Sequence, residues 1–351
     1  MLRGTHCLDY PLDSVTYLNI SKYIFIDFLF NYFKQGKTNM NNNVYTFQSP
    51  RSVAQNHLEK LGDLSSKLPV YVKTPVLYKT EEHDYVKAPG RHLILNTRNN
   101  QVINVVKDKF NLDYQPIHGV NIIEKMLIDS GLDLTDISRE YSEAYDGGRY
   151  VVNYTLPAHE IDLGGGDVSA LRLCHRNSFD GSWCFTLEVG YLRMVCTNGQ
   201  VSIDHFTLFK TKHTPKMSPH HGARKIAAVL NGFEKERERW TAWKEQSITD
   251  MEAFRIFAKA AKFQVDDQMS LYELLSSKNY KLSKAMNYMW SQYTKHEQKV
   301  LGSNEWAAYN AMTHWATHAP AATKSTAKNI VSIQVDRGEQ VRNACKLLKV
   351  A

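Results

Sequence analysis

Two basic segments contain the residues best suited to binding a polyanion. The first, residues 207–225, reads TLFKTKHTPKMSPHHGARK and contains no acidic residue. Its cations are Lys210, Lys212, Lys216, Arg224 and Lys225. A basic run between a strand and a long helix can follow the phosphates of a nucleic acid, although charge runs also occur as ordinary solvated faces. The segment therefore predicts a phosphate-binding track.

The second basic segment, residues 278–299, combines cations with aromatic rings. Lys281 and Lys284 precede Trp290, and Glu297 is the only acidic residue of the segment. Single-stranded DNA is bound by cations at its phosphates and by rings that stack on unpaired bases. The segment predicts such a surface, with Trp290 as a stacking ring. The alternative is that these rings are core residues of a helix, where Tyr and Trp are often buried.

Residues that could support metal or acid–base chemistry follow no recognised motif. The strand-rich part of the chain supplies the carboxylates Glu160, Asp162, Asp167, Asp180 and Glu188. The candidate metal-binding histidines are His213, His220, His221, His314 and His318. None of these histidines has the carboxylate or cysteine spacing of a known metal site. The sequence thus predicts no metal, no cofactor and no catalytic residue, with a metal-dependent nuclease as a minor alternative.

Residues 177–182, NSFDGS, have the composition of a tight turn. Asp180 can accept a hydrogen bond from its own backbone, and Gly181 can adopt positive φ. This turn belongs to a longer stretch, residues 171–199, that resembles a family of phage- and plasmid-borne proteins known as a domain of unknown function. The residues that carry the resemblance are Asn177, Ser178, Asp180, Gly181, Ser182, Arg193, Val195, Cys196 and Asn198.

Three further stretches resemble the same family and occur in the same order. They are the hairpin-like residues 92–110, the Gly147-Gly148-Arg149 tripeptide, and Lys212-His213-Thr214 followed later by WAAYNA at residues 306–311. The resemblance implies a role in the DNA biology of mobile elements and assigns no catalytic residue. A weaker similarity in the order of elements links the chain to phage single-strand annealing proteins.

The order of expected elements predicts an α+β fold. Short strands at 92–96 and 101–106 flank a polar turn, and a helix is expected over 120–130. Strands at 149–156, 169–174, 183–189, 191–196 and 201–209 are separated by turn signals such as Asp180-Gly181, which predicts an antiparallel meander with one inserted helix. A helical domain follows, with one or two helices over 223–261 and shorter ones at 270–277, 281–299 and 303–318.

We expect residues 1–39 to be a translated upstream extension that precedes the true start at Met40. The alternative is a partner-binding or membrane-surface helix. An N-terminal helix and linker are expected at 40–69. A β-rich domain at 70–210, a helical domain at 219–318 and a basic tail at 320–351 follow. The apolar residues 17–33 are interrupted by Lys22 and Asp27, so no membrane span is expected.

Composition limits the class of protein but names no function. The 351 residues carry a net charge of +7, which permits a polyanionic partner. Five cysteines without a CxxC pair argue against a disulfide framework and indicate reduced thiols in a bacterial cytoplasm. The leading hypothesis is a non-enzymatic protein that binds single-stranded DNA. Promotion of strand annealing and assembly into homo-oligomers are both compatible with this hypothesis. The alternative is an interaction protein that acts on a host factor.

Overall fold

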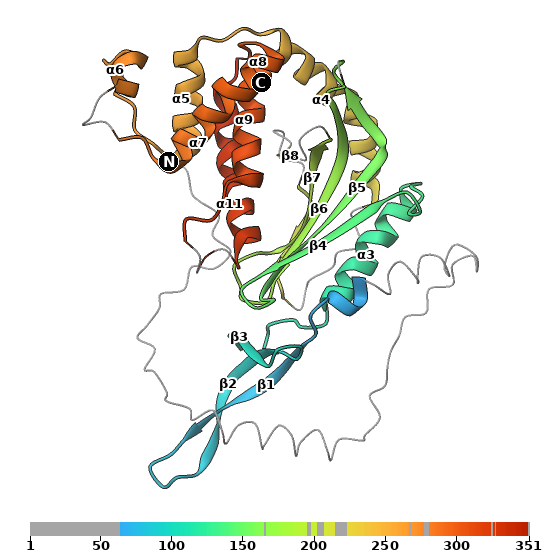
Figure 1. The fold of residues 1–351 in the computed structure, drawn as a ribbon. Helices are drawn as coiled ribbons and strands as arrows, with labels where there is room; N and C mark the ends of the chain where they lie inside the picture. Colours follow the sequence, from blue (N-terminus) through green and yellow to red (C-terminus); the bar gives the residue numbers. More distant parts are fainter. Residues whose placement is uncertain are drawn as a thin grey trace.

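The computed structural model describes residues 64–349, apart from 165, 195–197, 202–206, 215–222, 267, 277–280, 324–325 and 327. The expectations for residues 1–39, 40–63, Lys216, Cys196 and the His220-His221 pair lie outside the described residues. Element labels follow Figure 1. The fold is α+β, as predicted, with two antiparallel sheets and a set of helices that follows them in the chain.

A small three-stranded sheet begins the described chain. Its strands are β1 (Tyr71–Lys79), β2 (Tyr85–Asn96) and β3 (Gln101–Lys107), paired in the order β1-β2-β3. The predicted hairpin of β2 and β3 is confirmed, and Asn100 in its turn has φ 56°, which asparagine tolerates better than most residues. The long β1–β2 hairpin extends away from the rest of the fold (Figure 1).

The larger sheet has six strands, β4 (Ser138–Ala144), β5 (Arg149–Asp162), β6 (Val168–Ser178), β7 (Phe185–Arg193), β8 (Asn198–Val201) and β9 (Thr207–Thr211). The predicted antiparallel meander is confirmed in the order β4-β5-β6-β7-β8. The two strands expected at 183–189 and 191–196 form the single strand β7. Its outer edge pairs with β9 along its first half and with β8 along its second half.

Helices cover both faces of the larger sheet. The inserted helix α3 (Pro116–Asp129) and the long helix α4 (Ala223–Glu245) lie on the face to which Tyr150, Tyr154 and Tyr191 point. Alternate residues of the same strands, such as Val151 and Asn153, point to the opposite face, which is covered by α11 (Ile330–Ala344). This arrangement follows from the period-two alternation of a strand buried on both sides.

The remaining helices pack beside the larger sheet (Figure 1). They are α5 (Asp250–Ala261), α6 (Leu271–Ser276), α7 (Lys284–Gln292), a π-helical turn (Tyr293–Glu297), α8 (Gln298–Leu301) and α9 (Glu305–His318). The helical region 223–261 divides into α4 and α5 because Thr249 and Glu252 form a capping box that starts a new helix.

The expected basic tail contains helix α11 and a short 3₁₀ turn (Cys345–Leu347). Val341, Ala344, Cys345 and Leu348 are buried, and α11 lies alongside α9 (Figure 1). One hydrophobic cluster runs from Leu64 to Leu348 and includes residues of the sheet and of the helices. The described β-rich and helical regions therefore share one core.

The described residues bear on the expectations for a membrane span and for the cysteines. None of the described helices combines the length and the apolar character needed to cross a bilayer, and residues 17–33 lie outside the described part. Cys174 and Cys345 are free thiols, and burial raises the pKa of Cys174 to about 11. Cys184 is disulfide-bonded, so the expectation of five reduced thiols is wrong for this residue.

Candidate functional site

Three of the four family-like stretches meet at one end of the larger sheet. We call this place the motif junction and define it as residues 147–149, residues 177–182 and His213. The backbone N–H of Phe179 donates to the carbonyl of Gly148 over 2.8 Å. The Phe179 ring stacks on Tyr71 at a centroid distance of 4.0 Å, which ties the junction to the small sheet. Stretches far apart in sequence thus form one structural unit.

A chain of hydrogen bonds runs inward from the junction. His213 Nε2 lies 2.7 Å from Asn177 Oδ1, and His213 Nδ1 lies 3.1 Å from the carbonyl of Asn111. The Asn177 amide donates to the Tyr150 hydroxyl over 3.4 Å, and that hydroxyl lies 3.2 Å from His175 Nε2. Burial lowers the pKa of both histidines, that of His175 to about 4. The chain of hydrogen bonds fixes the position of the segment that follows β9.

The NSFDGS residues form the turn that the sequence predicts. Asp180 Oδ1 accepts a hydrogen bond from the backbone of Ser182 over 2.9 Å, and Gly181 has φ 83°. Arg149 spans the junction: it donates to Asp180 and Ser182 and, over 2.8 Å, to Ser332 of α11. The turn therefore joins the hairpin of β6 and β7 to a helix more than 140 residues later in the chain.

We expect Gly181→Val to lower the free energy of unfolding by about 1–3 kcal/mol, because a β-branched residue is strained at positive φ. The measurement is urea unfolding of the full chain. Gly181→Asn is the matched control, since asparagine tolerates this conformation and should cost less. Equal stability of the valine variant and the wild type would show that the turn rearranges without strain.

Arg193, another residue of the family-like stretch, lies in a second buried cluster. Its guanidinium binds Asp167 over 2.5 Å and Glu297 over 3.2 Å. Trp306, the first residue of the WAAYNA stretch, donates its indole N–H to the other oxygen of Asp167 over 2.7 Å. Glu297 ends the π-helical turn, a kind of helix irregularity that is frequent at functional sites. The WAAYNA part of the stretch that begins at Lys212 is thereby tied to the sheet.

Three of the five carboxylates considered for metal binding are paired with arginines. Asp180 binds Arg149, Glu188 binds Arg176, and Asp167 binds Arg193. Throughout the described part of the chain, no group of three or more His, Cys, Asp or Glu is placed to hold a metal ion. His314 contacts His318 and the Tyr288 hydroxyl. These placements favour a structural role for the carboxylates and give no support to the nuclease alternative.

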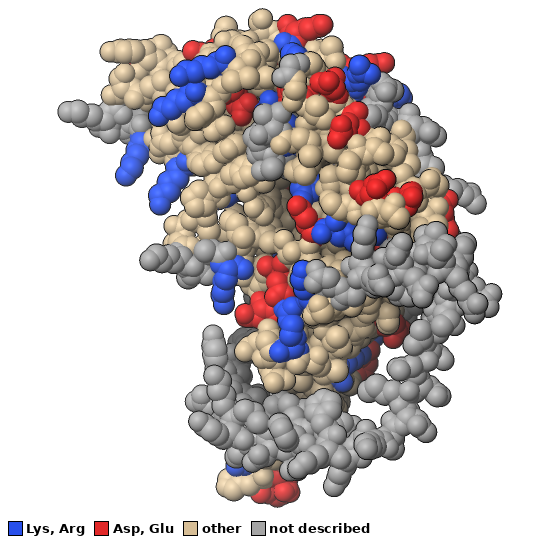
Figure 2. Space-filling view, turned by 45° about the vertical axis from the view of Figure 1, so that its right-hand side comes forward, with Lys and Arg blue, Asp and Glu red and all other residues tan. Residues whose placement is uncertain are grey.

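The predicted nucleic-acid residues fall into two groups. Lys210 on β9, Lys212 after it and Lys225 on α4 are exposed, as are Lys281 and Lys284 near the start of α7. None of the five forms an ion pair in the part of the chain that the structure describes. Arg224 lies in α4 and Asn198 in β8, but their side chains are outside the description. Figure 2 shows basic side chains projecting from the upper left of one face and mixed charges over its middle.

The Trp290 side chain is half-buried and does not project into solvent. Its ring makes edge contacts with Phe254 and Phe257 at centroid distances of 5.7 and 6.4 Å, and it packs on the core. This is the alternative that the sequence left open. We therefore do not include Trp290 in the binding surface proposed below.

The sequence-based prediction assigns no functional role to several residues at or beside the junction. Asn111 binds His213 through its backbone, the Phe110 ring stacks on His213 at 5.1 Å, and the neighbouring Lys109 is exposed. Arg149 connects the turn to α11. Phe110 and Arg149 both lie within family-like stretches, so the resemblance contained a signal that the charge pattern lacked.

Comparison with known proteins gives one family and no individual relative. No curated protein and no solved structure matches the sequence. A family model described as Domain of unknown function (DUF932) matches residues 115–341, which is more than half of the chain. This match runs from α3 to α11. It includes the hydrogen-bonded residues His213, Asn177, Tyr150 and His175 and the cluster of Asp167, Arg193 and Glu297. The chain therefore belongs to the DUF932 family.

Proposed function

We propose that the protein binds single-stranded nucleic acid without catalysing a reaction, as a part of phage or plasmid DNA transactions. The binding surface is the track formed by Lys210, Lys212 and Lys225, with Lys109 beside it. Annealing of complementary strands and assembly of several copies belong to the same proposal. The observation that carries this proposal is that most arginines of the sheets are ion-paired within the protein, whereas the lysines of the track are exposed and unpaired among the described residues.

Most arginines of the described sheets are neutralised within the protein. Those that form ion pairs with carboxylates are Arg98, Arg139, Arg149, Arg172, Arg176 and Arg193. The lysines of the track are exposed and form no such pair among the described residues. The excess positive charge is therefore available at the surface, where it can displace counterions from a polyanion.

Lys210 and Lys212 of the track lie beside the motif junction. Lys210 lies opposite Thr186 on the edge strand β9, and Lys212 immediately precedes His213. Because Asn177 and Asn111 both hold the His213 ring, the backbone that bears Lys212 has a fixed path. Phe110 stacks on the same ring, so Lys109 is placed next to this path. Fixed cations lose less conformational freedom on binding than mobile ones.

We expect the affinity for a single-stranded oligonucleotide to fall steeply with salt, with a log–log slope of about 0.7 per phosphate contact. Replacing Lys210, Lys212 and Lys225 together with glutamine should reduce that slope by up to about two units. The melting temperature should stay the same because the three side chains are exposed. Fluorescence anisotropy at several salt concentrations measures the slope.

The matched control replaces Lys79, Lys87 and Lys259 with glutamine. These lysines are also exposed, form no ion pair among the described residues and lie on β1, β2 and α5, so the net charge changes equally while the track stays intact. The control should bind like the wild type. If the wild-type protein shows no salt-sensitive binding to any nucleic acid at low salt, the proposal is wrong, and an interaction with a host protein takes its place.

A further inference from the structure

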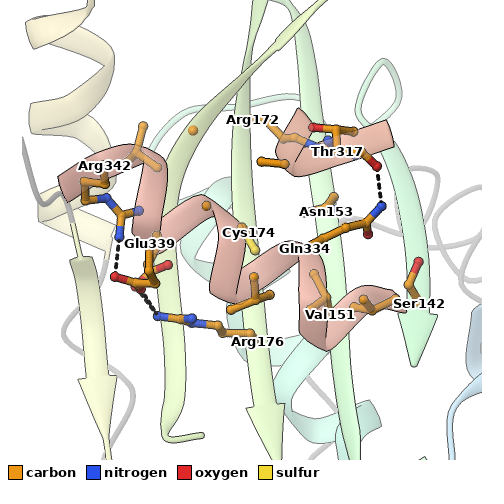
Figure 3. Close-up of a pocket in the computed structure, with 17 residues that line it drawn as sticks. Ser142, Val151, Asn153, Arg172, Cys174, Arg176, Thr317, Gln334, Glu339 and Arg342 are labelled. Atoms are coloured by element: carbon orange, nitrogen blue, oxygen red, sulfur yellow. Dashed lines mark hydrogen bonds and ion pairs between the residues drawn. The ribbon is translucent and has the colours of Figure 1, made fainter. Parts of the chain in front are cut away.

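A cleft of about 180 Å³ lies between the larger sheet and α11, away from the lysine track. Its floor is formed by strands β4 to β7 and its cover by α11 and the end of α9 (Figure 3). Val151, Val331 and Val335 supply apolar walls, and Arg172, Arg176 and Arg342 supply positive charge. A small cavity with apolar walls and a few placed polar groups has the character of a ligand site.

Two of the three arginines are engaged with carboxylates inside the cleft. Arg176 binds Glu188 over 2.8 Å and Glu339 over 3.2 Å, and Arg342 binds Glu339 over 3.1 Å (Figure 3). Three guanidinium groups face only two carboxylates within the lining. The lining therefore carries one positive charge in excess.

Arg172 is the arginine that is incompletely satisfied. It pairs through one terminal nitrogen with Glu140, whose side chain is 58% exposed and lies outside the lining. Its Nε is buried and has no hydrogen-bond partner. Across the strand pair, the buried Thr155 hydroxyl, directly opposite Arg172, also lacks a partner. An unmade hydrogen bond of a buried polar group is costly, and each such group in a folded protein calls for an explanation.

The geometry points to a site for a small organic oxyanion in this cleft. Arg172 Nε would donate to the anionic group, the Asn153 amide would donate beside it, and the valines would pack on the carbon part of the ligand. Asn153 lines the cleft and forms no side-chain hydrogen bond in the described structure. Gly190, opposite Arg172 on β7, has no side chain to fill the space. A phosphate monoester and a carboxylate share this chemistry.

Isothermal titration of the full chain tests the site with glycerol 3-phosphate, with butyrate and with neutral glycerol. We expect saturable binding of at least one anion with a dissociation constant of about 1 mM or tighter, and none of glycerol. The two anion arms identify the preferred group. Absence of saturable binding of both anions overturns the inference, whatever the result with DNA.

Arg172→Lys keeps the charge but loses the planar guanidinium N–H donors, and it should weaken anion binding by about tenfold. Arg98→Lys, at an arginine of the β2–β3 turn that binds Glu143, is the matched control and should leave binding unchanged. If Arg172→Lys does not fold, Asn153→Leu carries the test, because it removes an amide without a partner and narrows the cleft. Anion binding that is equal in Asn153→Leu and the wild type would place the ligand elsewhere and overturn the inference.

Discussion

Replacing Arg193 with methionine should lower the free energy of unfolding by about 3–5 kcal/mol. Only 5% of the Arg193 side chain is exposed, and Asp167 and Glu297 are 7% exposed. Methionine fills a similar volume but leaves two buried carboxylates without their common cation. Their desolvation is then uncompensated, and their mutual repulsion adds to it. Urea unfolding at neutral pH measures the loss.

An exposed pair provides the control for the loss of a charge as such. Lys125 binds Asp129 one turn later in α3, and both side chains are more than 40% exposed. Lys125→Met should change stability by only about 0.3–0.5 kcal/mol. If Arg193→Met were as mild as this control, the Asp167–Arg193–Glu297 cluster would not hold the WAAYNA helix against the sheet.

The second large effect is a loss of stability in acid that is due to His175. This residue is fully buried, and desolvation lowers its pKa to about 4, against 6.5 when the side chain is exposed. Below pH 6.5 the unfolded chain binds a proton that the folded chain does not, so the stabilising contribution is present above pH 6.5. It is lost as the pH falls toward 4. The loss over this interval is about 3 kcal/mol.

His175→Asn isolates this contribution from those of other groups. The asparagine amide can donate to the carbonyl of Thr186, which His175 Nδ1 contacts over 3.0 Å, but it does not titrate. The stability of the variant relative to the wild type should therefore rise as the pH falls from 7 to 4. Urea unfolding at several pH values measures the difference. A constant difference across this range would mean that His175 titrates with the same pKa in the folded and the unfolded chain.

The elements that the sequence predicted well have a strong local signal. The β2–β3 hairpin and the β6–β7 turn are marked by polar turn residues. Strands β1 and β4 were missed because neither has a regular strand pattern in its sequence. Pro75 interrupts β1, and β4 reads SREYSEA, which lacks the alternation of a half-buried strand.

Helix α11 was missed because much of its inner face is polar. Ser332, Glu339 and Arg342 bind groups across the cleft or within it, and Gly338 is buried against the sheet. A helix that docks through hydrogen bonds and ion pairs lacks the apolar stripe that reveals amphipathic helices. The same reasoning applies to the motif junction. No spacing rule predicts that His213 meets Asn177, because the contact depends on the pairing of β6, β7 and β9.

The position of α11 also bears on the order in which the protein folds. Its contacts with the sheet join residues far apart in the chain, since Arg149 and Ser332 are separated by 183 positions and Arg176 and Glu339 by 163. Closing loops of this length costs entropy before any contact compensates for it, so such contacts form slowly. During synthesis the face of strands β4 to β7 stays uncovered until α11 has left the ribosome. The valines and arginines of that face are then open to other chains, and this is the interval in which the protein is most exposed to aggregation and most dependent on chaperones.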